Sequence, residues 1–229
     1  MLAEAPASER GFLSASPVNA SALAVTAYCE RTTAAFWAEP FNALTNLAFL
    51  LAALLIAVRL RRAGGRYADV RLLASLAAAV GAGSFLWHTL ATPWTEWADV
   101  IPIGLFISVF LLNFLRRVAR LRWPAVILLF VAYQLINYLV LAFLPADLFN
   151  GSVFYLPAWA SLLLMVVYCR RTDRTVAPNV LAMWLIFSLS LVLRSVDMAL
   201  CPAFPAGTHF AWHLLNASVL WLAMRLLLD

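Results

Sequence analysis

The chain has 229 residues, of which 65% are hydrophobic and 12% charged, and its mean hydropathy is +0.89. These values exclude an ordinary soluble globular domain and indicate an integral membrane protein. The net charge of +5 arises from sixteen basic residues, all of them arginine. Most of these arginines stand beside apolar segments, so no nucleic-acid partner is expected.

Seven apolar stretches are long enough for a membrane-spanning helix, which needs about 20 residues. In chain order they cover residues 40–60, 70–91, 97–115, 123–143, 152–169, 179–200 and 207–227. Hydrocarbon offers no partner for backbone polar groups, so such stretches are expected to be helical. We therefore predict an all-α membrane protein with a seven-transmembrane helix bundle over residues 36–229. Residues 1–35, rich in alanine and serine, are predicted to form an extracytoplasmic tail that is partly mobile.

The arginines predict the orientation of the bundle. They follow the first, third and fifth spans as Arg59, Arg61, Arg62, Arg66 and Arg71, as Arg116, Arg117, Arg120 and Arg122, and as Arg170, Arg171 and Arg174. The connections after the second, fourth and sixth spans contain no arginine. By the positive-inside rule, the N-terminus is expected outside and the C-terminus in the cytoplasm.

With this topology, the polar residues inside the spans gather at one level, near the outer face. They are Ser84 and His88 in the second span, Asp99 in the third, Arg194 and Asp197 in the sixth, and His209 and His213 in the seventh. Ionisable groups at such depths are costly and usually mark a functional site.

The segment HFAWH, residues 209–213, contains two of the three histidines in the chain. Because an α-helix has about 3.6 residues per turn, His209 and His213 project from one helical face and can reach one metal. His88 would join them from the second span at matching depth. Three protein nitrogens with a position left for water form the open arrangement of a catalytic zinc.

Each of these residues also has a structural interpretation. A single histidine near a helix end is more often an interfacial or hydrogen-bonded residue than a ligand. Ser84, in the small-residue stretch GAGSF, could simply lie at a close helix contact. Arg194 precedes Asp197 by three residues, so these two could form an ion pair within the sixth span.

At this point the sequence resembles the alkaline ceramidase family of seven-helix intramembrane hydrolases, part of the broader CREST superfamily. The resemblance is carried by SFLWHTL, by Asp99 eleven residues after His88, and by HFAWHLLN downstream. It extends to YCER and WAEPFNALTNLAF near the first span, and so runs from about residue 27 to the C-terminus.

The resemblance implies Zn²⁺ held by His88, His209 and His213, with Ser84 and Asp99 beside the activated water. The implied reaction is hydrolysis of the N-acyl bond of a ceramide-like lipid to a long-chain base and a fatty acid. In this interpretation Asp99 carries the proton and Ser84 donates a hydrogen bond to the developing oxyanion. Asp197 and Asn216 are expected to orient the histidines. The lipid would enter sideways from the bilayer, and no obligate protein partner is expected.

The cysteines agree with an outward-facing site. Cys29 and Cys201 both fall on the predicted oxidising face, whereas Cys169 lies at the arginine-rich end of the fifth span. We expect a Cys29–Cys201 disulfide and a free Cys169, and the family resemblance implies the same pairing. The absence of lysine, with abundant alanine, leucine and arginine, suggests a bacterial inner-membrane protein whose site faces the periplasm.

One departure from the family concerns calcium. Mammalian members of the family bind Ca²⁺ through an N-terminal acidic cluster and a later Glu. The corresponding cluster reads AYCERT here, followed by Glu39. Glu30 and Glu39 keep two carboxylates, but Ala27 and Thr32 replace oxygen ligands and Arg31 adds an opposing charge. Calcium requires six to eight oxygens, so calcium binding at Glu30 and Glu39 is the weakest of these expectations.

Two other classes of function compete with the hydrolase. A metal-stabilised receptor or sensor of the same superfamily would keep the histidines without significant turnover. A transporter would need polar residues through the full depth of the bilayer, whereas the inner halves of the spans that carry the site are nearly pure leucine, alanine, valine and isoleucine.

Overall fold

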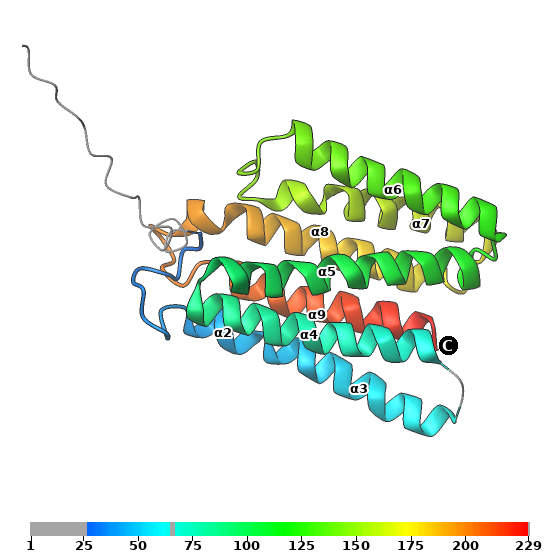
Figure 1. The fold of residues 1–229 in the computed structure, drawn as a ribbon, viewed down its shortest axis with the longest axis horizontal. Coiled ribbons are helices and arrows are strands. Elements are labelled where there is room, and N and C mark those ends of the chain that lie inside the picture. The colour runs from blue at the N-terminus through cyan, green and yellow to red at the C-terminus, as the bar shows by residue number, and fades with distance from the viewer. Residues whose placement is uncertain (1–26, 65–66, 229) are drawn as a thin grey trace, which may run out of the picture.

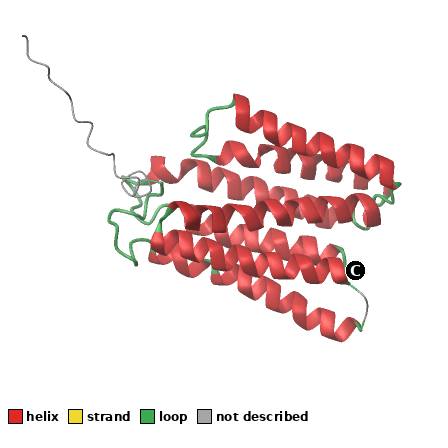
Figure 2. Cartoon of the chain, viewed as in Figure 1, coloured by secondary structure: helices red, strands yellow, loops and turns green. Residues whose placement is uncertain are grey.

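The computed structural model describes residues 27–64 and 67–228, which form helices joined by short loops (Figures 1 and 2). The α-helices are α2 (Pro40–Thr45), α3 (Leu47–Ala63), α4 (Ala68–Leu90), α5 (Pro93–Asn113), α6 (Trp123–Phe143), α7 (Leu156–Thr172), α8 (Ala177–Leu200) and α9 (His209–Leu226). A π-helical turn, η1 (Phe114–Val118), extends α5, and a 3₁₀ turn, η2 (Ser152–Tyr155), precedes α7. No strand occurs in the described residues, so the prediction of an all-helical fold is confirmed.

Six helical stretches of the described chain are long and apolar enough to cross a membrane: Pro40–Ala63, Ala68–Leu90, Pro93–Val118, Trp123–Phe143, Ser152–Thr172 and Ala177–Leu200. The last helix, α9, is not among them. It has 18 residues and carries two histidines, an asparagine and an arginine, yet it packs beside α3 and α8 (Figure 1). The count of seven spans and the orientation of the termini therefore stay predictions.

The third predicted span, 97–115, begins four residues earlier in the structure because of its N-terminal cap. Thr92 and Thr95 form a reciprocal capping box at the start of α5, and Pro93 occupies the first turn, where a missing N–H costs little. Helix α4 ends at Leu90, and the next residue, Ala91, has a left-handed φ of 48°. The sharp turn between these two ends places the last turn of α4 beside the first turn of α5.

A glycine allows α4 and α5 to approach closely near the candidate site. A Cβ atom at Gly83 would overlap the backbone of Ala98, so only glycine permits this contact. Gly83 immediately precedes Ser84, and Ala98 immediately precedes Asp99. The close contact therefore brings these two polar residues from adjacent helices to the same level.

The N-terminal segment crosses the end of the bundle where α2 begins (Figure 1). Cys29, in this segment, forms a disulfide with Cys201, at the end of α8, and their Cα atoms lie 5.4 Å apart. Cys169 is free and buried, so the cysteines pair as expected. Of the predicted tail, residues 1–26 lie outside the described residues, whereas residues 27–35 are described.

Candidate metal centre

The structure brings all three histidines together at one end of the bundle. Their candidate ligand atoms lie within 4.8 Å of one another. His88 comes from the last turn of α4, while His209 and His213 come from the first turns of α9, four residues apart. All three side chains are buried, with at most 2% of their surface exposed. This is the only such group of three among the described histidine, cysteine, aspartate and glutamate residues.

The hydrogen bonds of two histidines leave their Nε2 atoms for a ligand. Nδ1 of His88 lies 2.6 Å from Oε2 of Glu39. Nδ1 of His213 lies 2.9 Å from the Thr45 hydroxyl, which donates its own hydrogen to the Phe41 carbonyl at 2.7 Å. Both Nδ1 atoms therefore act as donors, which places a lone pair on each Nε2. His88 Nε2 is buried without a hydrogen-bond partner, as expected for an atom that coordinates a metal.

Glu39 connects this site to the N-terminal segment. One of its oxygens accepts from Nε of Arg31, and the other accepts from Asn42 at 2.9 Å as well as from His88. Burial alone would raise the pKa of the Glu39 carboxyl, but the hydrogen bonds from His88, Asn42 and Arg31 hold it below its usual range. An ionised carboxylate is the partner that fixes the orientation of a metal-binding imidazole.

Arg31 fixes Glu39 in turn and also holds the end of α4. Its Nη2 atom donates to the backbone carbonyl of His88 at 2.8 Å, and its Nη1 atom donates to that of Thr33 at 3.4 Å. The Arg31 side chain is buried. The N-terminal segment therefore contacts both the backbone and, through Glu39, the ring of the same histidine.

Glu30, unlike Glu39, binds backbone groups and no histidine. Its carboxylate accepts the backbone N–H groups of Phe41 and Asn42, at 2.7 Å and 2.8 Å, at the start of α2. A carboxylate in this position satisfies donors that a helix start leaves unpaired. Every carboxylate oxygen of Glu30 and Glu39 thus accepts a hydrogen bond from the protein, and the expectation of calcium at these two residues stays untested.

Ser84 and Asp99 share a small cavity with two of the histidines. The cavity has a volume of about 20 Å³, and its lining includes Ser84, Asp99, His209 and His213. Oδ1 of Asp99 is enclosed without a hydrogen-bond partner. A buried acceptor in this state is expected to receive a hydrogen bond from a bound water or ligand.

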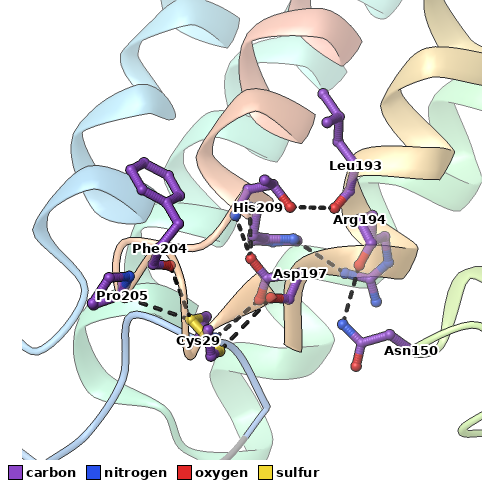
Figure 3. The surroundings of a disulfide bond; sticks show 10 residues. Cys29, Asn150, Leu193, Arg194, Asp197, Phe204, Pro205 and His209 are labelled. Carbon is purple, nitrogen blue, oxygen red and sulfur yellow. Dashed lines mark hydrogen bonds between the residues drawn. A yellow bond between two sulfur atoms is a disulfide. The ribbon is translucent and has the colours of Figure 1, made fainter. Parts of the chain in front are cut away.

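The structure gives Asp197 and Asn216 partners other than the histidine rings. Asp197 accepts the backbone N–H groups of Cys29, Thr208 and His209, and so joins the disulfide region to the start of α9 (Figure 3). Asn216 donates to Ser190 Oγ at 2.7 Å and to the Trp212 carbonyl at 2.9 Å. Both residues position α9 through backbone and helix contacts. The sequence alone does not show whether a buried Asp or Asn binds backbone groups, as here, or a histidine ring.

A second, apolar cavity adjoins the site. It has a volume of about 90 Å³ and runs between α5, α7, α8 and α9. Five residues line both cavities: Phe49, Val80, Ile103, Tyr155 and Trp212. A molecule with an alkyl chain and a polar end could therefore place the chain in the apolar cavity and the polar end beside the histidines.

Sequence reasoning missed several residues that contact the three histidines. Thr45 binds His213, Tyr28 stacks on His209 with ring centroids 3.8 Å apart, and Glu39 binds His88. The sequence indicated Glu39 only as a candidate calcium ligand. Tyr28 and Thr45 carry no local signal, because their contacts are made across long sequence separations.

Replacing Glu39 with glutamine is expected to weaken metal binding about 10- to 100-fold, the usual cost of losing a carboxylate that orients a ligand histidine. The substitution keeps the size of the side chain but removes the charge that holds His88 Nδ1 and Arg31. Metal affinity should be measured by chelator competition, with Glu96→Gln as the matched control because Glu96 is exposed. An unchanged affinity would show that Glu39 acts in packing alone.

Comparison with protein families matches residues 21–227 to the family described as Ceramidase. None of the curated proteins matches the chain. The matched range includes every element from α2 to α9 and all residues of the site.

Proposed function

Because this chain belongs to the ceramidase family, we propose that it is an intramembrane, zinc-dependent amidase that hydrolyses the N-acyl bond of ceramide-like lipids. The family implies a hydrolase that acts on amide bonds of a lipid substrate. One observation supports the zinc-dependent mechanism: three buried histidines lie at the same end of the bundle as Asp99 and Ser84, next to an apolar cavity. The products would be a long-chain base and a fatty acid.

His88, His209 and His213 would hold the metal. Imidazole nitrogen suits several transition metals, and a set of three without a fourth protein ligand favours catalytic zinc. Zinc in this position would supply the Lewis acidity that activates a water and polarises an amide carbonyl. Glu39 and Thr45 would keep His88 and His213 in the required tautomer.

The proton transfers would fall to Asp99. Its enclosed Oδ1 has no partner in the protein, so it can accept a proton from the attacking water and deliver it to the leaving amine. Ser84, in the same cavity, would donate a hydrogen bond to the oxygen that gains negative charge. The apolar cavity would receive part of the acyl chain, which fixes the scissile bond relative to Asp99.

The proposed setting is a seven-span protein with its site near the outer face. The arginine-rich connections support a cytoplasmic position for the opposite end of the bundle, and helix α9 would supply the seventh span. The Cys29–Cys201 disulfide, at the same end as the histidines, supports an oxidising compartment such as a bacterial periplasm. The lipid would enter from the bilayer.

The direct test is metal content and lipid hydrolysis of the purified wild-type protein. We expect about one zinc per chain, together with turnover of N-acyl sphingoid lipids that a chelator removes and added zinc restores. Zinc without turnover on any lipid amide would favour the receptor or sensor class. Turnover that survives complete removal of metal would contradict the mechanism.

A further inference from the structure

Arg194, near the end of α8, projects toward the metal centre. Its Nη1 atom donates to the Tyr28 hydroxyl at 3.2 Å. The same atom lies 3.5 Å from Nδ1 of His209 (Figure 3). Arg194 also lines the small cavity that contains Ser84 and Asp99. The guanidinium is therefore part of the site, although the proposed mechanism gives it no role.

This guanidinium has no carboxylate partner in the described part of the chain. Asp197, three residues later, uses its oxygens on the backbone N–H groups of Cys29, Thr208 and His209, so the ion pair considered from the sequence does not form. Asp99 shares the cavity but makes no ion pair with Arg194. Nε of Arg194 is enclosed and lacks any acceptor. A cation held in such surroundings without an opposite charge is costly.

Aromatic rings hold the guanidinium in place instead. Its central carbon lies 5.6 Å from the ring centroid of Tyr28, 5.7 Å from that of Tyr155 and 5.4 Å from that of Trp212. Cation–π contacts stabilise the charge without using N–H donors. The position of Arg194 is thus fixed in advance, while its Nη2 atom makes no hydrogen bond in the described structure and can donate to a ligand. Arg31 differs, because its donors bind Glu39 and two backbone carbonyls.

The neighbouring cavity indicates what the ligand would carry. Tyr155 and Trp212, two of the rings around Arg194, also line the apolar cavity. An alkyl chain that ends at these two rings would present its polar end to the guanidinium. A carboxylate matches the guanidinium in charge and geometry, because two of its oxygens can accept two parallel N–H bonds.

We propose that Arg194 binds a carboxylate carried by the lipid in the metal cavity. This inference rests on the proposed lipid-amidase function. The carboxylate has two chemical sources: the head of an N-acyl amino acid substrate, or the fatty acid released by hydrolysis. In both cases Arg194 distinguishes a charged lipid from a neutral lipid with the same chain.

The test compares charged and neutral lipids of equal chain length on the wild type, Arg194→Met and Arg194→Lys. Binding of a long-chain fatty acid and of the matching fatty alcohol is measured by calorimetry in detergent, on metal-loaded and metal-free protein. The fatty acid should bind Arg194→Met about 10- to 100-fold more weakly, the usual range for hydrogen bonds to a charged group. The alcohol should bind all variants equally, and Arg194→Lys should recover part of the loss. Arg174→Met, at an exposed site, is the control.

Kinetic measurements distinguish a carboxylate on the substrate from one on the fatty acid product. If the substrate carries the carboxylate, Arg194→Met should raise KM for an N-acyl glycine but leave KM for the neutral N-acyl ethanolamine unchanged. If the product carries it, only inhibition by the fatty acid should weaken. Equal losses for acid and alcohol would overturn the inference and leave the amidase intact. Selective acid binding without hydrolysis of any amide would instead overturn the proposed function and leave the carboxylate site intact.

Discussion

Replacing His213 with alanine is expected to remove the bound metal and to lower amide hydrolysis about 1,000-fold or more, since Lewis-acid stabilisation amounts to several kcal/mol and each 1.36 kcal/mol is a factor of ten. His213 is 2% exposed and belongs to the one group of three described histidine, cysteine, aspartate or glutamate residues that could hold a metal ion. Metal content should fall from about one per chain toward zero.

The measurement is elemental analysis of the variant and the wild type purified in parallel, followed by lipid hydrolysis at equal protein concentration. Ser218→Ala is the control on the same helix, because Ser218 is exposed and binds only the Leu214 carbonyl. His88→Ala should give the same double loss from the other helix. A variant that keeps its metal and loses only turnover would show that the removed histidine is not a ligand.

The parts of this site that sequence could predict are those set by local periodicity and by depth. His209 and His213 share a helical face because of their spacing, and His88 lies at the same level because hydropathy locates the ends of α4 and α9. A close helix contact was the structural alternative for the small-residue stretch around Ser84, and Gly83 makes such a contact with Ala98. These inferences need only the 3.6-residue period and the length of a span.

The connections around the histidines could not be predicted in the same way. Glu39 binds a histidine 49 residues away, and Tyr28 contacts a ring contributed by the last helix. Both residues belong to the N-terminal part of the chain, which has no hydropathy pattern to fix its path. Contacts of this kind depend on tertiary packing, and the Cys29–Cys201 disulfide that anchors the segment became an expectation only through topology and family resemblance.

The partners of Asp197 and Arg194 show the limit of pattern-based reasoning most clearly. Their spacing of three residues on one helix is typical of an ion pair. Gly207, with a φ of 63°, instead brings the backbone ahead of α9 against Asp197, and a Cβ at this position would overlap that carboxylate. The backbone therefore takes the acceptors that Arg194 would have used. Whether two opposite charges pair is decided by competing donors that a local pattern does not contain.

Replacing Asp99 with asparagine is expected to lower amide hydrolysis about 100- to 10,000-fold, the range for losing a positioned general acid–base group. The amide has almost the same shape but cannot carry a proton between water and the leaving amine. The metal would be held by three histidines and not by Asp99, so metal content should stay at the wild-type value. This combination separates a lost proton carrier from a lost metal.

Glu96→Gln is the matched control for this substitution. Glu96 lies three residues before Asp99 on α5, but its side chain is exposed, whereas Oδ1 of Asp99 is enclosed in the cavity. The control removes one negative charge from the same end of the same helix and should leave turnover unchanged. If Asp99→Asn keeps full activity with its metal in place, another group must carry the proton. If it loses metal as well, Asp99 belongs to the metal-binding set, and the mechanism must assign the proton transfer elsewhere.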